Sequence, residues 1–229
     1  SLRDTCQRSH AYAQVNYSLR YSQAYRVLAE LLGRQTIGPV LSIQASVGQY
    51  LPDWRAGQDY RRGVSARAEL GGGVLWELSH EIDYLRDLLG GITRVTAYVR
   101  RSGILDIDVE DVADLFMEFG DGAAGYLHLD MVRRDAMRTC VIVGGAGTLA
   151  LDFRKRSLKL YLASTGAWED ILSGEEEDAD AMHRTALTEL IERSETGANP
   201  TVGLEDGLAT LDVVLATKRS VAEGKAACP

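Results

Sequence analysis

The sequence predicts an α+β fold: a large, open, mixed and mainly antiparallel sheet with helices on one face. The main observation is a series of segments in which apolar and polar residues alternate, as in strands with one buried face. These segments are 92–101, 109–119, 123–133 and 137–144, with shorter ones at 148–153 and 157–163. Segments whose apolar residues recur at helical spacing lie before and after this series, at 20–32, 73–89, 179–195 and 204–223. In addition, 229 residues that are 45% hydrophobic can bury one large core.

Before the strand series, short regular elements alternate with one irregular segment. Residues 11–17 predict a short strand, and residues 20–32 predict a helix that ends at Gly33. Residues 39–49 alternate in polarity and predict another strand. Residues 50–70 have no clean period, so we expect a long loop, and ordered loops of this length are often functional.

The clearest helix is predicted for residues 73–89. Five apolar residues fall on one stripe at helical spacing and are expected to face the core: Leu75, Leu78, Ile82, Leu85 and Leu89. Nearer the C-terminus, the acidic run 175–178 predicts a solvated helix entry, because carboxylates are favourable at a helix N-terminus. Two helices then close the chain.

Two glycine-rich segments predict hairpin turns. Gly120, Gly122 and Gly125 form the pattern G-x-G-x-x-G, which occurs in dinucleotide-binding loops. Such a loop needs a helix after it, because the helix N-terminus holds the pyrophosphate. Here residues 126–131 alternate as a strand, and residues 144–147 are a second turn before a strand. The chain therefore shows no cofactor-binding fold of its own.

The charge excludes broad nucleic-acid binding and leaves one question open. The net charge is −8 at pH 7, whereas nucleic-acid binding requires a basic surface. Residues 1–67 differ from the rest, with nine Arg, no Lys and four acidic residues. Either these arginines form an ordinary solvated surface, or they form a loop that binds a phosphate or carboxylate through bidentate hydrogen bonds.

The cysteines and the hydropathy pattern indicate the compartment. Cys6, Cys140 and Cys228 are far apart and form no CxxC pair, so we expect reduced thiols in a cytoplasmic protein. No segment resembles a signal peptide or a membrane span, so we expect no membrane partner. The first residue is Ser1 rather than Met, which is typical of a fragment.

A polar cluster on helix 73–89 is the best candidate for chemistry. At helical spacing Glu77, His80 and Tyr84 share a face opposite the leucine stripe, with Asp83 near them. A carboxylate beside a histidine can orient the imidazole for proton transfer from a hydroxyl. A second interpretation is a polar helix face in water. A third is a metal site with Glu-x-x-His spacing, but the pair has no second copy and we expect no metal.

The sheet predicts self-association. An open sheet of several long strands needs cover on both faces, and few helices are available. We expect that the helices cannot bury all of the apolar and aromatic strand residues, among them Val112, Leu115, Tyr126, Leu129 and Val141. We therefore expect a homodimer or tetramer through the open sheet face, by isologous contact.

The order of several motifs resembles one family of oxidoreductases. Residues 71–85 resemble the signature of the glucose–fructose oxidoreductase / inositol dehydrogenase / MocA (Gfo/Idh/MocA) family: glycines, an apolar stretch, an acidic residue, and a His with an Asp three residues later. Residues 15–21 are similar to its Asn-x-x-Arg-Phe element, and residues 37–40 to its entry into the C-terminal sheet. Residues 144–149 resemble its glycine turn, and residues 207–220 its terminal helix.

The resemblance implies a second domain outside this chain. The fold would be a C-terminal domain like those of dihydrodipicolinate reductase and glyceraldehyde-phosphate dehydrogenase. Residues 1–19 would be the end of a nucleotide-binding Rossmann domain, and residues 20–229 the substrate-binding and oligomerisation domain. The cofactor, NAD or NADP, would be bound mainly by the absent domain, and we expect none in this chain alone.

The resemblance also implies roles for individual residues. His80 would move the hydroxyl proton, with Glu77 orienting it or the substrate. Asn16 would face the cofactor, and Arg20 and Asp83 would face the substrate.

One departure from the family pattern affects the histidine. The family usually has Asp where Glu77 stands and a longer interval before the His, so an alignment without a gap would put Glu81 at the catalytic position. Asp83 keeps the expected distance from His80, which favours His80.

The function implied is hydride transfer between a nicotinamide cofactor and a secondary alcohol of a sugar, polyol or nucleotide sugar. Four side chains of the loop would line the substrate pocket: Tyr50, Trp54, Arg55 and Tyr60. Aromatic faces suit sugar rings, and arginine suits an anionic substituent. The alternative is a non-catalytic carbohydrate-binding or dimerisation module.

Overall fold

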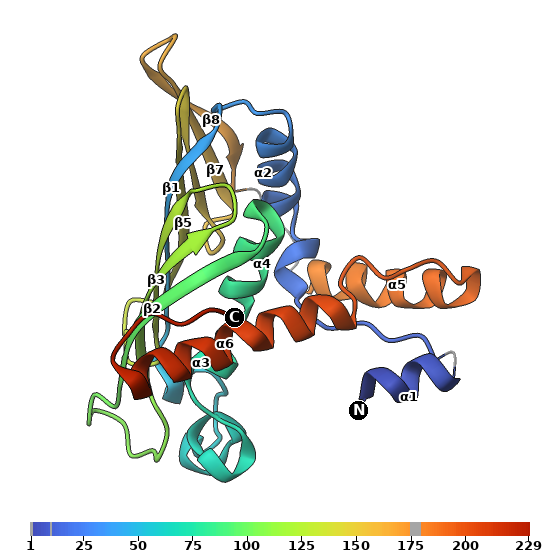
Figure 1. The fold of residues 1–229 in the computed structure, drawn as a ribbon, viewed down its shortest axis with the longest axis vertical. Coiled ribbons are helices and arrows are strands. Elements are labelled where there is room, and N and C mark those ends of the chain that lie inside the picture. The colour runs from blue at the N-terminus through green and yellow to red at the C-terminus, as the bar shows by residue number, and fades with distance from the viewer. Residues whose placement is uncertain (1, 10, 175–179) are drawn as a thin grey trace.

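An eight-stranded sheet organises the fold (Figure 1). The structure, a computed structural model, describes residues 2–9, 11–174 and 180–229. The strands lie in the order β2-β3-β4-β1-β5-β6-β7-β8. β1 (Val40–Gly48) pairs in parallel with β4 (Ala124–Asp130), and the other neighbouring strands are antiparallel. The predicted mixed and mainly antiparallel sheet is confirmed.

Tight turns connect several of the other strands. These strands are β2 (Ile92–Arg100), β3 (Val112–Phe119), β5 (Met137–Gly144), β6 (Gly147–Asp152), β7 (Ser157–Leu162) and β8 (Ala167–Ser173). Gly122, with φ 91°, lies in the hairpin between β3 and β4, so the G-x-G-x-x-G segment is a turn as predicted. Strand β8 was not predicted, because much of it is exposed and it lacks alternating polarity.

Helices cover one face of the sheet (Figure 1). The described helices are α1 (Leu2–Ser9), α2 (Gln23–Gly33), α3 (Val74–Glu77), α4 (His80–Leu89), α5 (Ala181–Thr196) and α6 (Leu204–Glu223), of which α1 and α5 lie away from the sheet. A short 3₁₀ helix, η1 (Ser18–Tyr21), precedes α2. α6 packs against β2, and α2 packs against β6 and β7, whereas α5 projects from the body and contacts η1.

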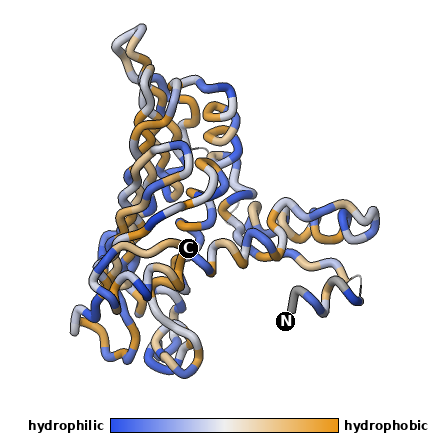
Figure 2. Tube along the Cα trace, in the orientation of Figure 1, coloured by the Kyte–Doolittle hydropathy of each residue, from blue (hydrophilic) through white to orange (hydrophobic). Residues whose placement is uncertain are grey.

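The core lies between the sheet and these helices. Alternate residues of β3 and β4, such as Leu115 and Leu127, point to the helices and are fully buried. All five residues of the predicted leucine stripe are buried, at 8% exposure or less. Burying each such aliphatic side chain stabilises the fold by about 1.5–3 kcal/mol. Figure 2 shows the resulting alternation of hydrophobic and hydrophilic residues along the strands.

Residues 73–89 form two helices rather than the one predicted. α3 ends at Glu77 and α4 begins at His80, and Leu78 between them has φ −107° and ψ 23°. The Ser79 hydroxyl donates a hydrogen bond to the carbonyl of Trp76 at 2.9 Å. A side chain that bonds a nearby carbonyl in this way competes with helical hydrogen bonds. The prediction of a continuous helix is therefore wrong.

The predicted strand at 11–17 is also wrong. Among the described residues this segment pairs with no strand of the sheet, and a strand needs such a partner. It is instead held beside α5: Val15 donates its N–H to the carbonyl of Val202 at 3.0 Å, and Gln14 Nε2 donates to the carbonyl of Ala186 at 3.1 Å.

The uncovered face of the sheet carries exposed aromatic side chains. Tyr98, Phe116 and Trp168 are 65%, 63% and 54% exposed. Phe116 packs against half-buried Tyr126, with ring centroids 5.3 Å apart. No helix covers this face in Figure 1.

Three residues expected to need cover from another subunit are buried within the chain. Val112, Leu115 and Leu129 are 3%, 0% and 0% exposed. Leu115 and Leu129 occupy the alternate positions that face the helices, so the prediction was wrong for them. Val141, like Tyr126, is half-buried.

Three further findings concern the chain as a whole. In the described residues, no helix has the length and apolar character to cross a membrane. The cysteines are free, with Cys140 buried and Cys228 exposed. The acidic run 175–178, predicted as a solvated helix entry, lies outside the described residues.

Candidate functional site

The glycine run before α3 packs tightly against neighbouring loops. Gly73 adopts φ +119°, a backbone conformation that favours glycine. A Cβ atom on Gly73 would lie 2.7 Å from Oε1 of Glu110, and one on Gly72 would lie 2.2 Å from the carbonyl oxygen of Val64. The run therefore fixes where α3 begins, and α4 begins at His80, three residues after the end of α3.

His80 lies at the first position of α4 in a largely buried environment. Its ring meets that of Tyr17 edge to face, with centroids 5.3 Å apart. Its Nδ1 atom is buried and has no hydrogen-bond partner in the described part of the chain. Burial, followed by the positive charges of Arg138 and His183, lowers the pKa of His80 to about 4. The imidazole is therefore neutral at physiological pH and can accept a proton.

Glu77 and Tyr84 do not share an exposed face with His80, so this prediction is wrong. The break after α3 places Glu77 on a different helix from the other two. Glu77 is half-buried and, within the described residues, forms no hydrogen bond with His80. Tyr84 is fully buried and packs against Phe153 with ring centroids 5.3 Å apart. A role for Glu77 in orienting His80 or the substrate stays a prediction.

Glu81, the alternative catalytic residue, is fully buried and paired with an arginine. Nε of Arg138, on β5, lies 2.8 Å from Oε1 of Glu81. The two groups are close but lack the alignment of a hydrogen bond. Burial raises the pKa of Glu81, and the charge of Arg138 opposes that rise. A carboxyl group at 0% exposure cannot reach a substrate, so the geometry favours His80.

Arg20 and Asp83 form the centre of a buried ion-pair network. Arg20 binds Asp83 in bidentate fashion, with Nε–Oδ2 at 2.8 Å and Nη2–Oδ1 at 2.6 Å. It also contacts Asp87 at 2.7 Å and Asp206 at 3.2 Å, which links η1, α4 and α6. Burial raises the pKa of Asp83 to about 6, although Arg20 lowers it. Because this guanidinium group already binds three carboxylates, we propose that the pair positions α4 rather than contacting substrate.

Three predicted substrate-binding residues line one cavity in the loop 50–70, which consists largely of short 3₁₀ turns. Trp54, Arg55 and Tyr60 lie around a space of about 310 Å³. Trp54 Nε1 donates a hydrogen bond to the Gln49 carbonyl at 3.1 Å. The Tyr60 hydroxyl accepts one from the Asp106 N–H at 3.2 Å. Substrate binding by these residues stays a prediction.

The other predicted site residues lie apart from this cavity. Tyr50 is half-buried under the guanidinium group of Arg134, which is 3.5 Å from its ring centroid. Asn16 is exposed. Across residues 2–9, 11–174 and 180–229, no group of three or more His, Cys, Asp or Glu could hold a metal ion.

The arginine-rich N-terminal part includes several exposed ion pairs. Arg34 pairs with Glu30, and Arg61 pairs with Asp59 at 2.8 Å. Arg67 pairs with its neighbour Glu69 in the same way. For these three arginines the structure favours a solvated surface over an anion-binding loop.

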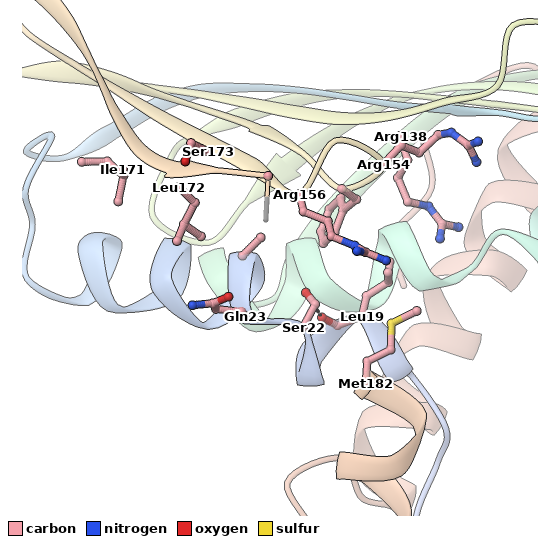
Figure 3. Close-up of a pocket in the computed structure, with 13 residues that line it drawn as sticks. Leu19, Ser22, Gln23, Arg138, Arg154, Arg156, Ile171, Leu172, Ser173 and Met182 are labelled. Carbon is pink, nitrogen blue, oxygen red and sulfur yellow. Dashed lines mark hydrogen bonds between the residues drawn. The ribbon is translucent and has the colours of Figure 1, made fainter. Parts of the chain in front are cut away.

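A different cavity, of about 380 Å³, lies between η1 and α2 on one side and β5, β8 and the turn between β6 and β7 on the other (Figure 3). Three arginines line it: Arg138, Arg154 and Arg156. Figure 3 shows their guanidinium groups toward the same end of the cavity. Arg138 is also one of the two positive charges that, after burial, lower the pKa of His80, although His80 itself is not among the residues that line this cavity.

Comparison with known proteins identifies the family. Residues 25–150 match the model of the GFO/IDH/MocA C-terminal domain, which is more than half of the chain. The chain belongs to the GFO/IDH/MocA family. The resemblance seen in the glycine, histidine and aspartate signature is therefore confirmed. No curated protein matches the chain in sequence.

Solved structures share this GFO/IDH/MocA fold. Levoglucosan dehydrogenase, in complex with NADH and L-sorbose, is 16% identical with a TM-score of 0.85, covering 95% of this chain and 66% of that one. Aldose-aldose oxidoreductase from Caulobacter crescentus, in complex with glycerol, is 20% identical with a TM-score of 0.83, covering 98% and 66%. An oxidoreductase domain protein from Kribbella flavida is 20% identical with a TM-score of 0.84, covering 99% and 68%. The chain thus spans about two thirds of these structures.

Sequence reasoning missed the aromatic neighbour of His80 and the arginines that line the larger cavity. Tyr17 lies within the Asn-x-x-Arg-Phe-like element, but nothing local shows that its ring meets His80. Arg138, Arg154 and Arg156 are more than 50 residues from His80 along the chain. Only the pairing of β5 with β6 and β6 with β7 brings these arginines to one cavity.

Proposed function

We propose that the chain is the substrate-binding and oligomerisation part of an NAD(P)-dependent oxidoreductase acting on a secondary alcohol of a sugar, polyol or nucleotide sugar. The observation that carries this proposal is the largely buried His80 at the start of α4, whose pKa is lowered by burial and then by the charges of Arg138 and His183, so that the imidazole is neutral. Membership of the family and the sugar and NADH complexes of levoglucosan dehydrogenase support it.

In this proposal His80 accepts the proton of the substrate hydroxyl. Because its Nδ1 is buried, we assign the proton-accepting role to Nε2. The nicotinamide cofactor supplies the redox chemistry when bound. A pKa of about 4 keeps the imidazole unprotonated but makes it a weak base. A substrate that raises this pKa toward neutrality would make the transfer more favourable.

The cofactor would be held mainly by a separate nucleotide-binding domain. The described residues include no strand, glycine turn and helix in the order that binds a dinucleotide. We propose that residues 1–19 belong to the end of that domain, with exposed Asn16 toward the cofactor, and that residues 20–229 form the substrate-binding domain. α1 stands apart from the sheet, in agreement with this division (Figure 1).

The open sheet face would pair subunits into a homodimer or tetramer. Tyr98, Phe116 and Trp168 supply exposed aromatic surface on strands β2, β3 and β8. Isologous pairing of this face would bury all three residues in each subunit. A cytoplasmic location stays a prediction from the free cysteines.

The test is an activity screen of this chain joined to a nucleotide-binding domain of the same family. Sugars and polyols are supplied with NAD⁺ or NADP⁺, and cofactor reduction is followed by absorbance. We expect reduction with at least one sugar. Sugar binding without reduction of either cofactor by any substrate would favour the carbohydrate-binding module and contradict the proposal.

A further inference from the structure

Among the residues that the structure describes, those that line the arginine-lined cavity carry positive charge and no acidic group. Arg138 is paired with Glu81 through Nε. Within the described part of the chain, Arg154 and Arg156 form no ion pair with a carboxylate. Guanidinium groups of which two have no carboxylate partner among the described residues, in a chain of net charge −8, indicate a site for an anion.

The turn that carries two of these arginines is tightly built. Oδ1 of Asp152 accepts hydrogen bonds from the N–H groups of Arg154 and Lys155, both at 3.0 Å. Arg156 adopts φ 51°, in the left-handed region that favours glycine. A Cβ atom on Gly174 would lie 2.5 Å from the carbonyl oxygen of Lys155, so the chain just after β8 packs directly on the turn. The arginines are thus presented by a fixed backbone.

The opposite end of the cavity offers groups that suit a sugar ring. Figure 3 shows Gln23 and Ser173 away from the arginine end. Both can exchange hydrogen bonds with hydroxyl groups. Apolar side chains such as Phe153 also line the cavity. A volume of about 380 Å³ is within the range of small-molecule sites.

We propose that this cavity binds the anionic substituent, a carboxylate or a phosphate, of a sugar-like substrate, so that acidic sugars are preferred over neutral ones. The substrate class rests on the proposed function, whereas the anion site rests on Arg138, Arg154 and Arg156. A bound anion also affects His80. It partly offsets the charge of Arg138, which is the second cause, after burial, of the low pKa of His80.

The test measures binding to this chain by calorimetry, with D-glucuronate, D-glucose 6-phosphate, inorganic phosphate and D-glucose as probes. We expect at least one anionic sugar to bind 10-fold or more tightly than D-glucose, in line with charge-assisted hydrogen bonds. Arg154→Gln with Arg156→Gln should weaken that binding roughly 10- to 100-fold. The matched control, Arg34→Gln with Arg94→Gln, removes the same charge from exposed sites and should leave the affinity unchanged. Equal effects of the two double variants would overturn the proposal.

A second measurement covers the case in which the cavity variant unfolds. In NMR spectra of the unchanged chain, saturating D-glucuronate or D-glucose 6-phosphate should shift the side-chain signals of Arg154 and Arg156, which line the cavity. Shifts confined to residues outside the cavity would place the anion elsewhere and overturn the proposal. Binding of D-glucuronate, of D-glucose 6-phosphate or of both supports the proposal and identifies the anionic substituent as a carboxylate or a phosphate. Binding of neither sugar overturns the proposal.

The outcomes separate this inference from the proposed function. If the two-domain enzyme oxidises neutral sugars and no anion binds, the inference fails and the proposed function stands. If the anion binds at the arginines and no sugar reduces NAD⁺ or NADP⁺, the proposed function fails and the anion site stands.

Discussion

Replacing Arg20 by Met tests whether the ion-pair network at α4 is structural. Met keeps an apolar stem but leaves Asp83, whose side chain is 1% exposed, without its counterion and close to Asp87 and Asp206. Removing one partner of a buried ion pair destabilises a protein by about 3–5 kcal/mol. For a chain of this size, that corresponds to a fall in Tm of roughly 6–20 °C. The loss should be smaller at pH 5 than at pH 7, because the pKa of Asp83, already about 6, rises further and the carboxyl group becomes protonated.

The assay is urea unfolding followed by circular dichroism at pH 5 and pH 7. The matched control is Arg34→Met, because Arg34 pairs with Glu30 where both side chains are exposed, at 70% and 55%. That control should change the free energy of unfolding by less than about 0.5 kcal/mol. A loss below about 1 kcal/mol for Arg20→Met at pH 7, or a loss independent of pH, would refute the reasoning.

Three further predictions follow from the same structure. Calorimetric titration of this chain alone with NADH should show no binding, because the described residues contain no dinucleotide-binding unit, and micromolar affinity would contradict this. As pH falls from 6.5 to 4, the chain should lose up to about 3 kcal/mol of stability relative to His80→Gln, because unfolded His80 takes up a proton in this window and the folded form, with a pKa of about 4, does not. Equal pH dependence of the two chains would refute that account. Light scattering should show that the unchanged chain is a dimer or tetramer. Phe116→Asp on the open sheet face should dissociate it, whereas Leu187→Asp, at a similarly exposed position on α5, should not. A monomeric unchanged chain would count against association.

The sheet was predictable because its signal is local. Alternation along β3 and β4 records directly which residues, such as Leu115 and Leu127, face the helices. β8 escaped prediction because a strand exposed on much of its surface has no such alternation. The break between α3 and α4 escaped prediction because Leu78 lies on a regular apolar stripe, whereas its backbone angles and the hydrogen bond from the Ser79 hydroxyl show the interruption in the structure.

The site was predictable only in part. His80 could be singled out from the glycine, histidine and aspartate spacing, but its environment depends on long-range contacts. Arg20 and Asp83 were expected at the substrate, whereas they bind each other, because a pairing 63 residues apart has no local signature. Arg138 is brought to Glu81 by the place of β5 in the sheet, and its charge lowers the pKa of His80; the sequence shows neither.

The most direct test of the proposed catalysis is a kinetic comparison of His80→Ala and Glu81→Ala in an enzyme that carries both domains. We expect His80→Ala to lower kcat by about 10²–10⁴-fold, as for a lost general acid–base. KM should change far less, because the transferred proton matters mainly in the transition state. Glu81→Ala leaves Arg138 unpaired and should lower stability, while the folded enzyme keeps a kcat close to that of the unchanged protein. A large loss of kcat for Glu81→Ala beside a mild loss for His80→Ala would contradict the account.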